Sequence, residues 1–78
     1  MAKQSIVERA VEKEQSMDVD IYSRAAEFFT AYIGAEIQST DVAVLQILFA
    51  LAKEGRNPSR ENLGDIICEA LVIAKLRS

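Results

Sequence analysis

The sequence contains no histidine, no tryptophan and a single cysteine, Cys68. Without histidine the chain lacks the base of a serine-hydrolase triad and the imidazole ligands of most zinc sites. A lone thiol forms no disulfide within the chain and suits a reducing compartment. These absences exclude a disulfide-stapled domain and histidine-dependent catalysis.

Proline occurs once and glycine three times, whereas half of the residues are apolar. This composition excludes a disordered or low-complexity chain. The longest apolar run is interrupted by Gln46 and is too short to cross a bilayer, and no apolar signal segment is evident. A net charge of −3 lacks the basic footprint that nucleic-acid binding needs. We therefore predict a cytoplasmic protein that binds neither membranes nor nucleic acid.

Apolar residues recur at helical spacing in four segments, which predicts an all-α fold. We expect a small bundle of three to four helices, completed by dimerisation, in one domain of 78 residues. Gly34 and Gly55 are placed to end helices, and Asn57 or Ser59 to cap the last one. The expected helices cover residues 5–15, 19–33 and 42–54 and the stretch after Pro58.

The segment 19–33 carries every aromatic residue except Phe49, in two rows at helical spacing. The rows are Ile21, Ala25, Phe28 and Tyr32, and Tyr22, Ala26, Phe29 and Ile33. We interpret this wide apolar face as part of the core. Stacking on a base or a cofactor is the alternative.

The segment 42–54 is apolar on every side, with ten apolar residues among its thirteen. A helix of this kind is buried all round, and the other helices of so short a chain cannot enclose it alone. We therefore predict that a second copy covers one side of this helix, or of its neighbour, giving a homodimer. The predicted core or interface residues are Val44, Leu45, Leu48, Phe49 and Leu51.

Glu61, Asp65 and Glu69 are spaced at i, i+4 and i+8 on the expected last helix. Like charges at this spacing repel, so a compensating partner is expected. The alternatives are Mg²⁺, which prefers carboxylate oxygens, a cation such as Arg24 or Lys53, and solvent. We favour an ion-paired or solvated face.

Arg24 and Cys68 each have a structural and a functional interpretation. For Arg24 we favour an ion pair with Asp20 or Asp65 over a phosphate contact, although a guanidinium group matches phosphate oxygens. For Cys68, flanked by Ile67 on a packed helix, we favour a small core residue over a reactive thiol.

The segment Glu61-Asn62-Leu63-Gly64-Asp65-Ile66-Ile67 resembles the second metal-binding motif of MazG-like all-α nucleotide pyrophosphohydrolases. Over residues 20–71 the chain also resembles short phage and prophage proteins of unassigned function that are related to that fold. The matching pieces are 20–26, 31–34, 41–43, 57–58 and 63–66. The resemblance implies a MazG-like core over residues 18–78, preceded by an N-terminal helix and hinge over residues 1–17.

The same resemblance implies Mg²⁺ as a cofactor, held by acidic side chains on the triphosphate of a nucleotide. The ligands implied in this chain are Asp20, Glu61, Asp65 and Glu69. The set is incomplete, because Asn62 replaces a glutamate of the motif and the first acidic motif has no clean counterpart. Catalysis by metal-activated water needs an adequately ligated ion, so an enzyme is the less favoured interpretation.

We therefore predict a small phage-type helical module that acts by protein contact or by binding a nucleotide without efficient hydrolysis. The first alternative is a Mg²⁺-dependent nucleoside triphosphate pyrophosphohydrolase. The second is a structural or inhibitory protein that docks an apolar helix face on a larger host or phage protein.

Overall fold

The computed structural model describes residues 5–78, which form four α-helices and no strand. They are α1 (Ile6–Ser16), α2 (Asp20–Ile33), α3 (Ser39–Arg56) and α4 (Arg60–Arg77). The all-α prediction is confirmed for this part of the chain. Residues 1–4, the beginning of the predicted N-terminal segment, lie outside the described residues. Within residues 5–78 no helix is long and apolar enough to cross a membrane.

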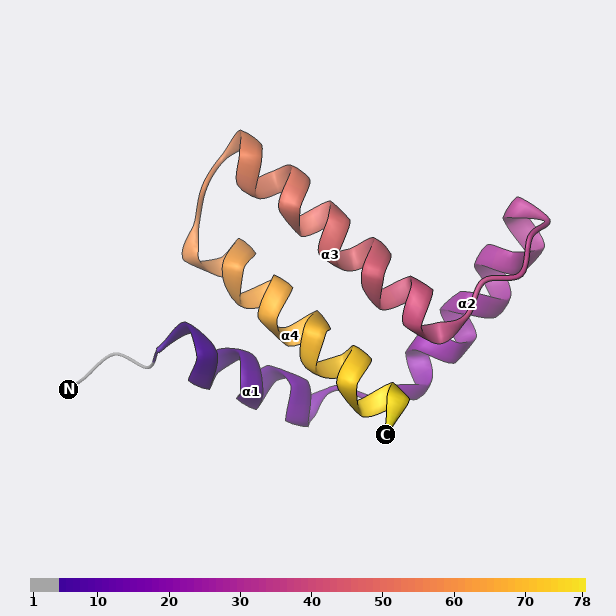
Figure 1. Ribbon diagram of the computed structural model, residues 1–78, viewed down its shortest axis with the longest axis horizontal. Coiled ribbons are helices and arrows are strands. Elements are labelled where there is room, and N and C mark those ends of the chain that lie inside the picture. The colour runs from indigo at the N-terminus through magenta and orange to yellow at the C-terminus, as the bar shows by residue number, and fades with distance from the viewer. Residues whose placement is uncertain (1–4) are drawn as a thin grey trace.

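The four helices form an open array. The neighbouring pairs are α1 with α4, α4 with α3, and α3 with α2. In Figure 1, α1, α4 and α3 lie side by side and α2 projects from the end of this layer. The molecule measures 48 × 30 × 15 Å, so it is flat. In a closed four-helix bundle each helix packs along two neighbours. Among the described helices, by contrast, α1 packs along α4 alone and α2 packs along α3 alone, although Tyr22 of α2 reaches α4.

The ends of the helices follow from local chemistry in two cases and depart from the prediction in a third. Gly34 ends α2 in the left-handed conformation, with φ of 80°, as expected. Ser59 caps α4, because its hydroxyl accepts from the backbone N–H of Asn62 at 3.1 Å; Asn57, the other predicted cap, does not. Gly55 was expected to end α3, but it has no positive φ and the helix continues to Arg56.

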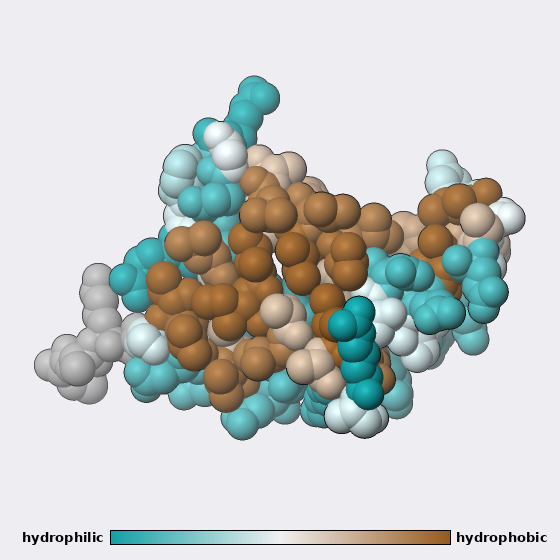
Figure 2. All heavy atoms as spheres, viewed as in Figure 1, coloured by the Kyte–Doolittle hydropathy of each residue, from teal (hydrophilic) through white to brown (hydrophobic). Residues whose placement is uncertain are grey.

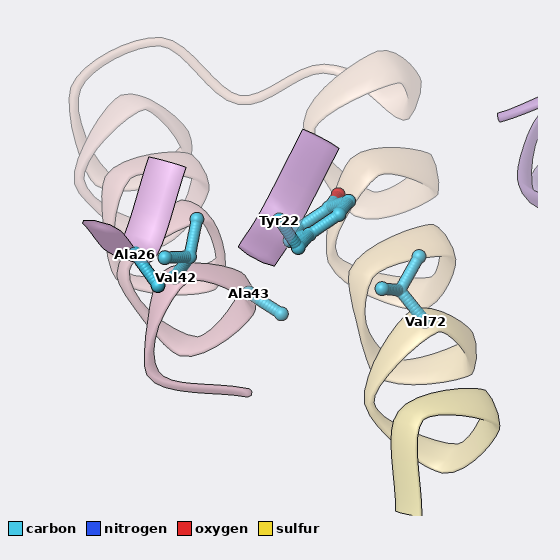
Figure 3. Close-up of a cluster of buried hydrophobic side chains, with 5 residues drawn as sticks. All are labelled: Tyr22, Ala26, Val42, Ala43 and Val72. Atoms are coloured by element: carbon cyan, nitrogen blue, oxygen red, sulfur yellow. The ribbon is translucent and has the colours of Figure 1, made fainter. Parts of the chain in front are cut away.

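The buried core is small and lies where α2, α3 and α4 meet (Figure 3). It consists of Tyr22, Ala26, Val42, Ala43 and Val72. Cys68 is also fully buried, which confirms its predicted place in the interior. Alanine allows helices to approach closely but buries little apolar area. Much of the apolar surface of the chain therefore stays outside this core.

Only part of the apolar face of α2 lies in the core, which corrects the interpretation of the whole face as interior: Ile33, at the end of the row of Tyr22, is 54% exposed. Tyr22 is 4% exposed, and Phe29 is partly buried. Ile21, Phe28 and Tyr32, from the other row, are 58%, 71% and 90% exposed. The reason lies in the open array, since α2 has a helix neighbour along only one side.

Candidate functional site

The implied metal ligands do not come together as a cluster. Among residues 5–78 there is no group of three or more aspartate, glutamate or cysteine side chains that is arranged to hold a metal ion. Asp20 begins α2, and Glu61 lies in the first turn of α4. Asp65 and Glu69 are engaged with other side chains of the protein. The geometry therefore adds no support for a magnesium site.

Asp65 forms ion pairs that connect α4 to α1 and α3. The ammonium nitrogen of Lys13 lies 2.7 Å from one carboxylate oxygen, and that of Lys53 lies 4.0 Å from the other. The hydrogen bond to Asp65 raises the pKa of Lys13, and partial burial opposes this effect. Cations were one of the three predicted ways to offset the repulsion between carboxylates along α4. The structure contains two of them, the predicted Lys53 and also Lys13.

Glu69 is 9% exposed and accepts a hydrogen bond from the hydroxyl of Tyr22. A buried carboxylate without a donor is costly, so this bond satisfies a group that α4 carries into the interior. Burial, and then the bond to Glu69, raise the pKa of Tyr22. The carboxylate of Glu69 is thus bound inside the protein.

Together these residues form what we call the polar cluster: Lys13, Tyr22, Lys53, Asp65 and Glu69. Each of the four helices contributes at least one member. Beside it lies a hollow of about 180 Å³ that Gln46 and Phe49 also line, and Lys53 lies 5.3 Å from the centre of the Phe49 ring. Because each charged group has a partner within the chain, the cluster connects the helices to one another.

Arg24 does not form the ion pair that the sequence favoured. Its side chain is on the exposed part of α2, and the ion pairs found between residues 5–78 do not involve it: they join Lys13 and Lys53 to Asp65, and Lys75 to Glu14. Asp65, one of the two predicted partners, is already bound by two lysines, and among residues 5–78 no ion pair joins Arg24 to the other, Asp20. A phosphate contact by Arg24 stays a prediction.

Glu61 lines a hollow of about 320 Å³ between α1 and α4. Its charged neighbours there are Arg9, Lys13, Arg60 and Asp65. Three cations and two carboxylates meet in this hollow, and Lys13 and Asp65 bind each other. The arrangement does not select a ligand of either charge.

The surface over α3 and α4 is apolar on the side shown in Figure 2. We define the α3–α4 apolar face as Val44, Leu45, Leu48, Leu51 and Leu63, which are 40% to 54% exposed. On α3 these side chains lie away from Ala43 and Ala50, which are buried. Figure 2 shows a broad continuous hydrophobic area over α3 and α4. Phe49, 58% exposed, lies beside Lys53 and the polar cluster. The chain thus leaves α3 partly uncovered, as its sequence predicts.

In comparisons with known proteins, no family model matches the chain, and no curated protein or solved structure matches it. The relation to MazG-like pyrophosphohydrolases and to phage proteins therefore stays a prediction from the sequence motifs.

Proposed function

We propose that the chain is a small helical module that acts by protein contact, and that a second copy of the chain covers its α3–α4 apolar face. The observation that carries this proposal is the exposure of Val44, Leu45, Leu48 and Leu51, which ranges from 40% to 54% on one side of one helix. Large contiguous apolar patches on a water-soluble domain mark contact sites.

A second copy suits this face because of its chemistry and its spacing. The five residues carry no charge, so two identical faces meet without repulsion. Val44, Leu48 and Leu51 follow one another at steps of four and three, the spacing by which paired helices interlock. A two-fold axis places the same patch on both partners.

The apolar face supplies a limited amount of binding energy. Fully burying a valine or leucine side chain gains roughly 1.5–3 kcal/mol, so covering the exposed half gains about 1 kcal/mol. Five such side chains on each of two copies give about 10 kcal/mol. Association costs roughly 4–15 kcal/mol in lost motion and ordering. The face alone therefore supports only a weak dimer.

Protein contact is favoured over hydrolysis because two of the four implied metal ligands are already occupied. Asp65 binds Lys13 and Lys53, and Glu69 accepts from Tyr22. Release of pyrophosphate from nucleoside triphosphates in the presence of Mg²⁺, and its loss in Asp65→Asn, would favour the pyrophosphohydrolase instead.

Light scattering over a range of micromolar concentrations tests the proposal. We expect a mass that rises toward twice the 8.6 kDa of one chain. Leu48→Lys places a charge in the middle of the apolar face, so this variant should keep the mass of one chain. The matched control is Gln46→Lys, which adds the same charge on α3 beside the polar cluster.

Gln46→Lys should associate like the unmodified protein. A constant mass of one chain for the unmodified protein, or equal association of Leu48→Lys and the unmodified protein, would contradict the proposal.

A further inference from the structure

α2 carries a second apolar surface, separate from the α3–α4 apolar face. We define the α2 arm surface as Ile21, Phe28 and Tyr32, of which Tyr32 is 90% exposed. These residues lie on a different side of α2 from Tyr22 and Ala26, which pack in the core. Two aromatic side chains in water at the end of a projecting helix require an explanation.

The end of α2 that carries Phe28 and Tyr32 has a defined shape. The hydroxyl of Thr30 accepts from the backbone N–H of Ile37 at 2.9 Å and donates to its carbonyl at 3.3 Å. The left-handed turn at Gly34 returns the chain along α2, toward the start of α3 (Figure 1). The two aromatic side chains are therefore held on a preorganised projection, which reduces the entropy lost on binding.

We infer that the α2 arm surface of one copy packs on the α3–α4 apolar face of a second copy, and that a two-fold axis makes this contact mutual. The inference rests on the proposed function, since it adds the α2 arm of the second copy to the contact between the two α3–α4 apolar faces. Figure 2 shows hydrophobic surface both over α3 and α4 and at the α2 end of the same side of the molecule, so one partner can cover both.

The area that a stable dimer needs supports this contact. A covered phenylalanine or tyrosine buries roughly 150–250 Å². Phe28 and Tyr32 are 71% and 90% exposed, so four such side chains from two copies contribute roughly 500–800 Å². A specific interface buries roughly 1,200–2,000 Å² in total. The two arms therefore supply a substantial part of the buried area that a specific interface needs beyond the α3–α4 apolar faces.

The position of the arm predicts what it covers. α2 lies at one end of the long dimension of 48 Å, and the first turns of α1 and α4 lie at the other (Figure 1). Two flat copies placed face to face about a two-fold axis perpendicular to the long dimension bring the arm of one copy over the first turn of α4 of the other. Leu63, 41% exposed, stands in that turn.

The first test measures the dissociation constant of the dimer by sedimentation equilibrium. Phe28→Glu and Tyr32→Asp should each weaken association at least tenfold, because each places a charge in a covered apolar contact. Both side chains are exposed in the single chain, so the fold of one copy should be retained. The control is Ser23→Glu, an exposed position on another side of α2, which should change association less than twofold.

The second test uses thiol cross-linking between copies. Tyr32→Cys chains are mixed with Leu63→Cys chains and treated with a short bifunctional thiol reagent. The native Cys68 is fully buried and stays unreactive. We expect cross-links between residue 32 of one copy and residue 63 of the other. Cross-links only between two residues 32, or none, would overturn the inference.

The two proposals fail in different ways. If Leu48→Lys dissociates the dimer whereas Phe28→Glu and Tyr32→Asp associate like the unmodified chain, the arm contact is wrong and the proposed function stands. If the unmodified chain has the mass of one copy at every concentration, both are wrong.

Discussion

In the polar cluster, two carboxylates of α4 are each bound by a side chain from another helix. Glu69 is placed on α4 by sequence spacing, but its burial is tolerated because Tyr22 donates a hydrogen bond to it. Lys13 likewise binds Asp65 from another helix. The acidic stripe of α4 is therefore stabilised by partners that lie 47 and 52 positions away in the sequence.

Replacing Tyr22 by phenylalanine should destabilise the fold by about 1–3 kcal/mol, because a buried oxygen of Glu69 then lacks its donor. Urea denaturation at neutral pH and fixed protein concentration measures this change. Tyr32→Phe is the control, since its hydroxyl belongs to a side chain that is 90% exposed; we expect less than about 0.5 kcal/mol. Equal effects of the two substitutions would show that the buried bond does not stabilise the fold.

The same bond predicts how stability depends on pH. Burial and Glu69 raise the pKa of Tyr22 in the folded chain, whereas the pKa of an unfolded tyrosine is about 10. The folded state therefore keeps the proton to higher pH, so this stabilisation is complete below about pH 10 and is lost as pH rises further. The raised pKa of Lys13 acts in the same direction. We expect a shallower alkaline loss of stability in Tyr22→Phe than in the unmodified protein.

At the scale of the helices, periodicity was sufficient to locate all four helices, although not every helix end. The four helices are where the apolar spacing places them, and Gly34 ends α2 as expected. The predicted end of α3 was wrong by two residues, because Gly55 permits a helix to end without requiring it. Which row of α2 is buried was beyond local signals, since both rows have suitable spacing and only a neighbouring helix distinguishes them.

Two glycines of these helices should respond to alanine with opposite signs. Gly64 has no positive φ, and an added Cβ would meet Ile6 at 3.8 Å, an ordinary contact. Gly64→Ala should therefore stabilise α4 by about 0.5–1 kcal/mol. Gly34→Ala should destabilise by about 1–2 kcal/mol, because φ of 80° strains any residue with a side chain. Urea denaturation measures both, and changes of the same sign would contradict the helix assignments.

At the scale of the whole molecule, the open array leaves more apolar surface exposed than a closed bundle would. α4 is covered by α1 and α3 on its two sides, but no helix among residues 5–78 lies over the outer side of α3. This arrangement is the reason for expecting that folding and self-association are coupled.

If they are coupled, the melting temperature depends on protein concentration. A tenfold increase should raise the melting temperature by roughly 3–6 °C, because mass action favours the associated folded state. Calorimetry or circular dichroism at several concentrations measures this. Leu48→Lys should melt at one temperature regardless of concentration. A concentration-independent melting temperature of the unmodified chain would contradict the coupling.

The sequence by itself determined the helices, the left-handed stop at Gly34, the buried place of Cys68 and the excess of apolar residues on α3. Each of these depends on residues within a few turns of one another, where spacing and backbone preference decide. Only the tertiary structure decided that Tyr22 donates a hydrogen bond to Glu69, that Lys13 pairs with Asp65, and that Phe28 and Tyr32 are exposed. These outcomes depend on which helices become neighbours, and no local pattern encodes the packing of segments that are far apart in the chain.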